Sequence, residues 1–241
     1  MKRFLAFALT VALLLNASFS LAEGSFSKQE GDFSLRNGLR FGMSVEEVRS
    51  LEKDYGTSTD GTINPPEREN LNPTGYLKML KYWPVTMMDC SNGALHFYFD
   101  SNDKLMSIGY EFNAGTANSP SYSTVFSEMK TLLNNKYGTP CNDNDFMSPE
   151  LTTSMLSDDI ISYTLMHSEG SRPSFRALNQ WIVEYDDYYV LIDLYSVTWF
   201  SDLPTDTYLG YRVLSPEELT EILKKIESEN DAQETKRQND F

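Results

Sequence analysis

The sequence predicts an α+β fold in which two similar halves, each a helix followed by an antiparallel meander, form one sheet with helices packed on one face. Two observations lead to this fold class. Short segments in both halves alternate apolar and polar residues, which is typical of strands with one buried face. Between the two sets of strands, residues 122–137 carry apolar side chains at helical spacing, and Gly138 and Pro140 then end the helix. The expected buried stripe consists of Tyr122, Val125, Phe126, Met129, Leu132 and Leu133.

Residues 1–22 have the pattern of a signal peptide. Lys2 and Arg3 precede an apolar run over residues 4–15, and Ser20-Leu21-Ala22 offers the small residues that a signal peptidase reads. The alternative is a membrane anchor, but the run is shorter than the roughly 20 apolar residues needed to span a bilayer. We therefore expect an exported protein, secreted or periplasmic, that is not inserted in a membrane after signal removal.

The chain is strongly acidic. Its formal net charge is −15, and loss of the signal segment removes two positive charges and gives −17. Such a surface repels phosphate backbones and anionic lipids, so we expect no nucleic-acid partner, and a membrane surface is a poor candidate. Basic peptides, cations and neutral glycans remain open. The alternative interpretation is that the charge serves only solubility.

The first half is expected at residues 36–118, after a flexible polar linker at 23–35. Ser44 is a good N-cap residue, and Glu47 three positions later predicts a capping box at the start of a short helix. Residues 57–75 are rich in proline and glycine and predict a long loop.

Strands follow in the same half. Residues 91–93 (SNG) are a strong hairpin-turn signal. Apolar and polar residues then alternate over 95–99 and again over 106–112, which predicts an antiparallel pair with one apolar face.

The second half is expected at residues 119–213. Its helix is followed by predicted strands at residues 160–166, 181–185, 190–194 and 208–213. The order of elements matches that of the first half and predicts an internal structural repeat. Ser215, Pro216 and Glu218 start a C-terminal helix within 214–229. Residues 230–241 are charged and polar and are expected to be disordered.

Three motifs carry a resemblance to a known group. Residues 41–48 (FGMSVEEV), 98–105 (YFDSNDKL) and 136–140 (KYGTP) resemble signposts of largely uncharacterised small exported bacterial proteins. The helix-plus-meander units of that group are similar to those of the β-lactamase inhibitory protein and of small outer-membrane-assembly lipoproteins. The resemblance covers roughly residues 36–213. It implies a tandem α+β fold with an exposed sheet face, and it carries over no functional residue. The loop at 57–75 and the absence of a lipid-anchor cysteine depart from the group.

The sequence holds no recognisable catalytic or cofactor motif. The chain has two histidines, His96 and His167, and no H-E-x-x-H pattern, so we expect no metal site and no cofactor. Asp143 and Asp145 alternate like calcium ligands, but the glycine and glutamate of a calcium loop are missing, which favours a solvated loop.

We therefore expect a non-enzymatic binding module, with two alternatives left open. The first is a cell-wall or glycan hydrolase that uses Glu184 and Asp193, because paired strands could bring two carboxylates together. The second is a structural envelope component. Cys90 and Cys141 are also open to two interpretations, a disulfide in the oxidising compartment or two buried free thiols.

The expected recognition surface is the sheet face opposite the apolar registers. If the aliphatic rows pack under the helices, the alternating tyrosines face solvent, where they offer large contact area at low entropy cost. The candidate partner-binding residues are His96, Tyr98, Glu111, Glu184, Tyr189, Asp193 and Tyr195. The expected partner is a protein or peptide, with a glycan as the alternative. An ordinary solvated sheet face is the competing interpretation of the same pattern.

Overall fold

The structure is a computed structural model of the whole chain, and residues 26–52, 58–62, 78–112, 122–144, 174–198, 205–224 and 228 are described here. The expected signal segment at 1–22, the strand at 160–166 and the tail at 230–241 lie outside these residues. Within the described part of the chain, no helix is long and apolar enough to cross a membrane.

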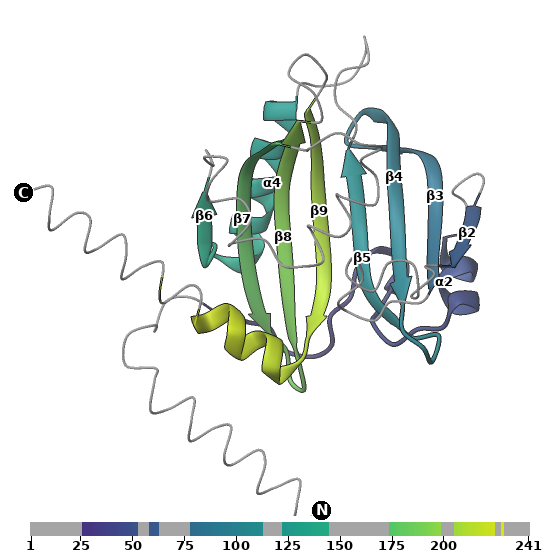
Figure 1. Cartoon of the computed structure of the whole chain (residues 1–241), viewed down its shortest axis with the longest axis horizontal. Helices are drawn as coiled ribbons and strands as arrows, with labels where there is room; N and C mark the ends of the chain where they lie inside the picture. Colours follow the sequence, from purple (N-terminus) through teal and green to yellow (C-terminus); the bar gives the residue numbers. More distant parts are fainter. Residues whose placement is uncertain are drawn as a thin grey trace, which may run out of the picture.

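One large sheet dominates the described residues, and the fold is α+β, as the alternation predicts (Figure 1). The strands run in the order β1-β7-β8-β9-β5-β4-β3-β2, and β6 pairs with β7 beside this path. The pair β1–β7 is parallel, and the other described pairs are antiparallel. The strands are β1 (Phe26–Lys28), β2 (Ser58–Thr62), β3 (Lys78–Met87), β4 (Cys90–Phe99), β5 (Leu105–Phe112), β6 (Asn142–Asn144), β7 (Ser174–Glu184), β8 (Tyr189–Thr198) and β9 (Thr205–Leu214).

Two meanders make up most of the sheet. Strands β3-β4-β5 form one and β7-β8-β9 form the other, and β5 joins β9 edge to edge. Strand β2 lies within residues 57–75, where the sequence predicts a loop. This prediction was wrong at 58–62, because pairing with β3 imposes an extended backbone on a segment with weak intrinsic strand propensity.

The cap signals in the sequence predict the start of α2 and the end of α4. In α2 (Val45–Leu51), Ser44 Oγ accepts a hydrogen bond from Glu47 N, and Glu47 Oε2 accepts one from Ser44 N, so the expected capping box is confirmed. Helix α4 (Tyr122–Tyr137) ends as Gly138 adopts a φ of +82° and donates its N–H to Asn134 O. A short 3₁₀ turn, η2 (Arg36–Gly38), precedes α2.

The main core lies between the sheet and α4, with α2 on the same side (Figure 1). Cross-strand registers place one apolar residue from each of six strands in a continuous row under these helices. This apolar row consists of Leu80, Phe97, Ile108, Tyr211, Ile192 and Trp181, all buried. Helix α4 contributes Val125, Phe126, Met129 and Leu133 to the core. Leu132, which the sequence places in the same stripe, is instead exposed.

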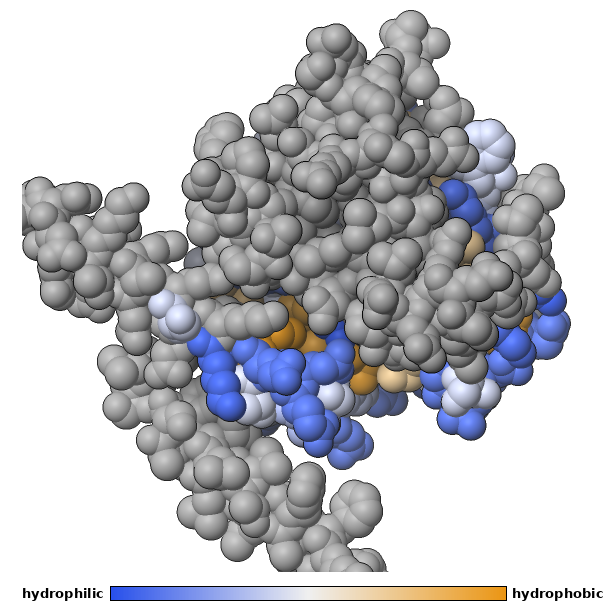
Figure 2. Space-filling model, in the orientation of Figure 1, coloured by the Kyte–Doolittle hydropathy of each residue, from blue (hydrophilic) through white to orange (hydrophobic). Residues whose placement is uncertain are grey.

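The C-terminal helix, residues 216–224, lies on the opposite face of the sheet. Leu219 belongs to a second apolar cluster with Ile182 and Leu191, whose neighbours Trp181 and Ile192 point to the α4 side. A capping box between Ser215 and Glu218 starts this helix. Figure 2, in the orientation of Figure 1, shows mainly hydrophilic residues at the lower edge of the molecule, where this helix lies.

Candidate functional site

All of the residues expected to form a recognition surface share one face of the sheet. On β4, His96 and Tyr98 alternate with the core residue Phe97, and on β8, Asp193 alternates with Ile192. Side chains alternate across a strand, so these residues point away from α4. The same register argument places Glu111, Glu184, Tyr189 and Tyr195 on this face.

This face is more buried than the sequence predicts. The exposed fractions are 1% for His96, 7% for Tyr98, and 5% for both Asp193 and Tyr195. The expectation that these four residues lie on an exposed surface was therefore wrong, whereas Glu111, Glu184 and Tyr189 are partly exposed. Alternation assigns a side chain to a face of a sheet, but it carries no information about what covers that face.

A row of polar residues and glycines crosses the centre of this face. Successive registers place one residue from each of seven strands side by side. This central polar row consists of Lys81, His96, Gly109, Gly210, Asp193, Gln180 and Asn142. It lies one residue along the strands from the apolar row, on the other side of the same backbone.

The Asp193 end of the central polar row is a buried hydrogen-bond chain. Asn142 Nδ2 donates to Gln180 Oε1 at 3.0 Å, and Gln180 Nε2 donates to Asp193 Oδ1 at 2.6 Å. The three side chains are all buried. Burying such groups without partners would be strongly unfavourable, so these two hydrogen bonds stabilise the buried arrangement of the three side chains.

The His96 end is built from a carboxylate and an aromatic ring. His96 Nε2 lies 3.1 Å from Glu111 Oε2, and the His96 ring stacks on Tyr98 with centroids 6.3 Å apart. Glu111 lies opposite Tyr208, whose ring stacks on Tyr195 at 5.0 Å. Two carboxylates therefore lie near the middle of the sheet, Asp193 within the central polar row and Glu111 beside it.

Between the two ends lies the glycine floor, defined as Gly109 of β5 and Gly210 of β9, which face each other in register. Both glycines are partly exposed, although His96 and Asp193 on either side are buried. Three strand spacings separate His96 from Asp193, so a strip about 14 Å wide between their Cα atoms carries no side chain.

Packing against the described residues does not require glycine at either position. A Cβ at Gly109 would lie 3.7 Å from His96 Cβ, and one at Gly210 would lie 4.0 Å from Asp193 Cβ, both ordinary contacts. Neither glycine has a positive φ. Glycine inside a strand weakens the strand and often marks a close approach by a ligand or another backbone. The glycine floor and its two carboxylate-bearing flanks are therefore the candidate functional site.

Sequence reasoning missed three members of this site, Gly109, Gly210 and Gln180. The signal for the glycines was present, because each interrupts an otherwise apolar or aromatic strand. No signal in the sequence predicted that the two glycines pair. Their pairing requires β5 to meet β9 across a separation of about a hundred residues, and local patterns do not encode such contacts.

The carboxylate pair expected for a hydrolase is not assembled. Asp193 faces Gln180, and Glu184 faces Tyr189, so the two acids lie four residues apart along the ladder. This spacing corresponds to about 13 Å, beyond the 5–10 Å used by glycosidases. Glu184 instead pairs with Lys28 at 3.3 Å.

No metal centre is found among the described residues, where no three His, Cys, Asp or Glu side chains gather closely enough to hold an ion. His167 and Asp145 lie outside those residues. Asp143 accepts hydrogen bonds at Oδ1 from Lys130 and Asn179, at 2.6 and 2.8 Å.

The two cysteines are free thiols on opposite sides of the sheet. Cys90 is part of the core on the α4 side, and Cys141 packs against the second cluster near the C-terminal helix. The disulfide interpretation was therefore wrong for this structure. Burial, and to a lesser degree the charge of Asp193, raises the pKa of the Cys141 thiol to about 12. Burial also raises the pKa of Cys90, so both thiols remain protonated and unreactive near neutral pH.

Comparison of the chain with known proteins finds no relative. No protein-family model, no curated protein and no solved structure matches the chain.

Proposed function

We propose that the protein is an exported, non-enzymatic binding module that holds an extended segment of a protein or peptide partner over the glycine floor. The observation that carries this proposal is the pairing of Gly109 with Gly210 between buried polar side chains, at a place where packing would accept larger residues. Bare backbone permits the close approach that an extended chain needs.

The charge of the site and of the chain favours a partner with a basic group. Asp193 of β8 lies beside Gly210, and Glu111 lies two residues from Gly109 along β5, so two carboxylates border the glycine floor. The exported chain would carry a formal charge of −17 after loss of Lys2 and Arg3 from −15. A strongly acidic protein attracts cationic partners at long range. Tyr208 and Tyr195 add a stacked aromatic wall beside the floor.

We also propose that the two meanders are a structural repeat, as the matching order of elements in the sequence suggests. In this view the pairing of β5 with β9 is the junction between the halves, and the glycine floor is a feature of that junction. The likeness of the sequence motifs to small exported proteins supports the same tandem organisation and the export of the chain.

The test uses substitutions that fill the floor and leave its neighbours intact. The double variant Gly109→Ala with Gly210→Ala adds two methyl groups at ordinary contact distance, so it should melt at or above the temperature of the parent. Exported proteins of the producing cell are captured on the immobilised parent, identified, purified and titrated against both proteins. We expect a partner whose affinity falls at least tenfold in the double variant.

A matched control is Leu132→Ala, which alters an exposed residue of α4 on the other side of the sheet. Equal affinity in the parent, the control and the double variant would contradict a site at the glycine floor. If the immobilised parent retained a glycan and no protein, the proposal of a protein or peptide partner would be wrong. Alanine at Tyr195 is a poor probe, because it removes a buried ring and tests stability before it tests binding.

A further inference from the structure

A cleft lies on the α4 side of the sheet, away from the glycine floor. It measures about 520 Å³ and lies between the segment that leads into α2, the turn after β7, and the ends of β5 and β9. Met106 of β5 and Val213 of β9 each lie two residues from a core residue, Ile108 and Tyr211, and therefore point to the same face. This places the cleft on the core side of the sheet. Its volume is within the range of small-molecule sites. We call it the Arg40 cleft, after one of its lining residues.

The apolar wall of the Arg40 cleft is held in place by the core. Phe41 stacks on Phe33 with ring centroids 4.7 Å apart, and it meets the edge of Tyr188 at 6.5 Å. Phe33 N donates to Tyr188 Oη at 2.7 Å, which fixes the tyrosine across the cleft. Phe41 and Tyr188 are partly exposed, so a preformed aromatic surface faces the cavity.

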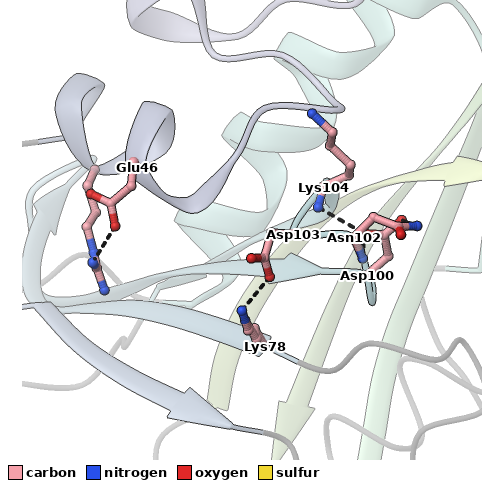
Figure 3. Close-up of polar contacts among 7 residues, drawn as sticks. Glu46, Lys78, Asp100, Asn102, Asp103 and Lys104 are labelled. Atoms are coloured by element: carbon pink, nitrogen blue, oxygen red, sulfur yellow. Dashed lines mark hydrogen bonds and ion pairs between the residues drawn. The ribbon is translucent and has the colours of Figure 1, made fainter.

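Two cations stand on the rim of this cleft. Arg40 and Lys104 are exposed, and within the described segments neither lies at ion-pair distance from a carboxylate. Backbone hydrogen bonds from Gly42 N to Leu105 O and from Leu105 N to Met43 O tie their two segments together. In Figure 3 the Lys104 side chain extends beside the segment that leads into α2, whereas Lys78 is engaged with Asp103.

The rim also carries two carboxylates, one already engaged in hydrogen bonds and one not. Glu47 is committed to the cap of α2, because its Oε2 accepts hydrogen bonds from Ser44 N and Oγ at 2.7 and 2.8 Å. Asp32 is exposed beside Tyr188 and has no hydrogen bond or ion pair among the described residues. The cleft thus combines two exposed cations, an uncommitted carboxylate and an aromatic wall.

We propose that the Arg40 cleft binds a small zwitterion with an apolar body, the class that includes apolar amino acids. The ligand carboxylate pairs with Arg40 and Lys104, the ammonium group pairs with Asp32, and the apolar side chain packs on Phe41 and Tyr188. Arginine provides the planar, bidentate geometry that carboxylates favour. This site shares no residue with the glycine floor, so it would provide a ligand-binding function in addition to partner binding.

Isothermal titration of the purified protein with four related probes tests this assignment. L-phenylalanine carries both charges, 3-phenylpropionate only the carboxylate, 2-phenylethylamine only the ammonium group, and N-acetyl-L-phenylalanine amide neither. We expect L-phenylalanine to bind about tenfold or more tightly than either singly charged probe, since each lacks one charge-assisted hydrogen bond. The neutral probe should bind most weakly.

Three variants complete the test. Arg40→Gln and Asp32→Asn should each weaken L-phenylalanine binding by about tenfold or more at an unchanged melting temperature, because both residues are exposed. Lys78→Gln is the matched control, since its ammonium group pairs with Asp103 outside the cleft and its loss should leave binding unchanged. Absence of heat at millimolar L-phenylalanine, equal binding of 3-phenylpropionate, or full affinity in Arg40→Gln and Asp32→Asn would overturn the proposal.

Discussion

The two faces of the sheet are both buried near its centre, but they are buried in different chemical ways. On the α4 side, the apolar row from Leu80 to Trp181 packs against helices and needs no hydrogen bonds. One residue further along each strand, the central polar row from Lys81 to Asn142 links its two amides to Asp193 by hydrogen bonds, and its imidazole contacts Glu111 beside the row. The first arrangement provides stability. In the second, each buried polar group depends on its partner, because an unpaired polar group in the interior is costly.

This contrast shows why burial alone does not identify a core. His96 and Phe97 are adjacent in β4 and almost equally buried, yet only Phe97 contributes apolar area to folding. The two faces differ most at the glycine floor. There the polar face has no side chain, whereas the neighbouring pair on the apolar face is Ile108 and Tyr211. Substitutions on the two faces should therefore differ in size and in kind.

The largest effect is expected from Phe97→Ala on the apolar face. Phe97 is fully buried and meets the Tyr82 ring edge-on at 6.1 Å. Its truncation should reduce the free energy of unfolding by about 3–5 kcal/mol, because apolar area is lost and a cavity remains. Urea unfolding followed by circular dichroism measures this change. Leu132→Ala, at an exposed position, should stay within about 0.5 kcal/mol, and a comparable loss in both variants would contradict the contrast.

The next effect concerns the hydrogen-bonded pair on the polar face. Gln180→Leu or Asp193→Leu alone leaves the other buried group without its 2.6 Å partner and should cost about 1–3 kcal/mol. The double variant removes both polar groups together. We therefore expect its loss in unfolding free energy to be smaller than the sum of the two single losses. Strict additivity in this double-mutant cycle would show that the pair is not coupled.

Local features of this fold were largely predictable from the sequence. The capping box of Ser44 and Glu47 and the helix stop at Gly138 depend on residues within a few positions of each other, and both are confirmed. Alternation also placed His96 and Asp193 correctly on the face away from α4. These signals are local because caps and strand parity are set by neighbouring residues.

Features that depend on distant partners were not predictable in the same way. The burial of His96 and Tyr195 was missed because alternation is silent about what lies above a face. Strand β2 was missed because its backbone is extended by pairing with β3 rather than by its own composition. The register of Gly109 with Gly210 has the same origin, so the centre of the candidate site was invisible until the two meanders were placed together.

Glycines on the two faces give the third prediction. Gly93 has the parity of Leu95 and lies on the apolar side, where a Cβ would approach Glu111 O and Met87 Cε to 2.9 Å. Gly93→Ala should therefore lower the free energy of unfolding by about 1–3 kcal/mol. Gly109→Ala meets only an ordinary contact and should raise stability by up to about 1 kcal/mol, because alanine loses less backbone entropy. Equal changes in urea midpoint would contradict a difference between the two glycines.

The smallest expected effect is electrostatic and lies at the start of α2, which covers part of the apolar face. Hydrogen bonds from the backbone and then the side chain of Ser44 lower the pKa of Glu47 below its ordinary 4.5, with smaller contributions from Lys104 and Arg40. A carboxyl whose pKa is lower in the folded state stabilises the fold above its ordinary pKa. That contribution is lost as the pH falls through the lowered value.

Glu47→Gln isolates this contribution, because the amide keeps the shape of the side chain but not its charge. At pH 7 the parent should melt at a slightly higher temperature than the variant, since a charged acceptor bonds Ser44 N more strongly than a neutral one. As the pH falls below 4.5 and then through the lowered pKa of Glu47, its side chain becomes protonated in the parent, and the two melting temperatures should converge. Melting curves between pH 3 and pH 7 measure the difference. A constant difference over that range would show that Glu47 acts through packing or shape, and the cap would then be independent of charge.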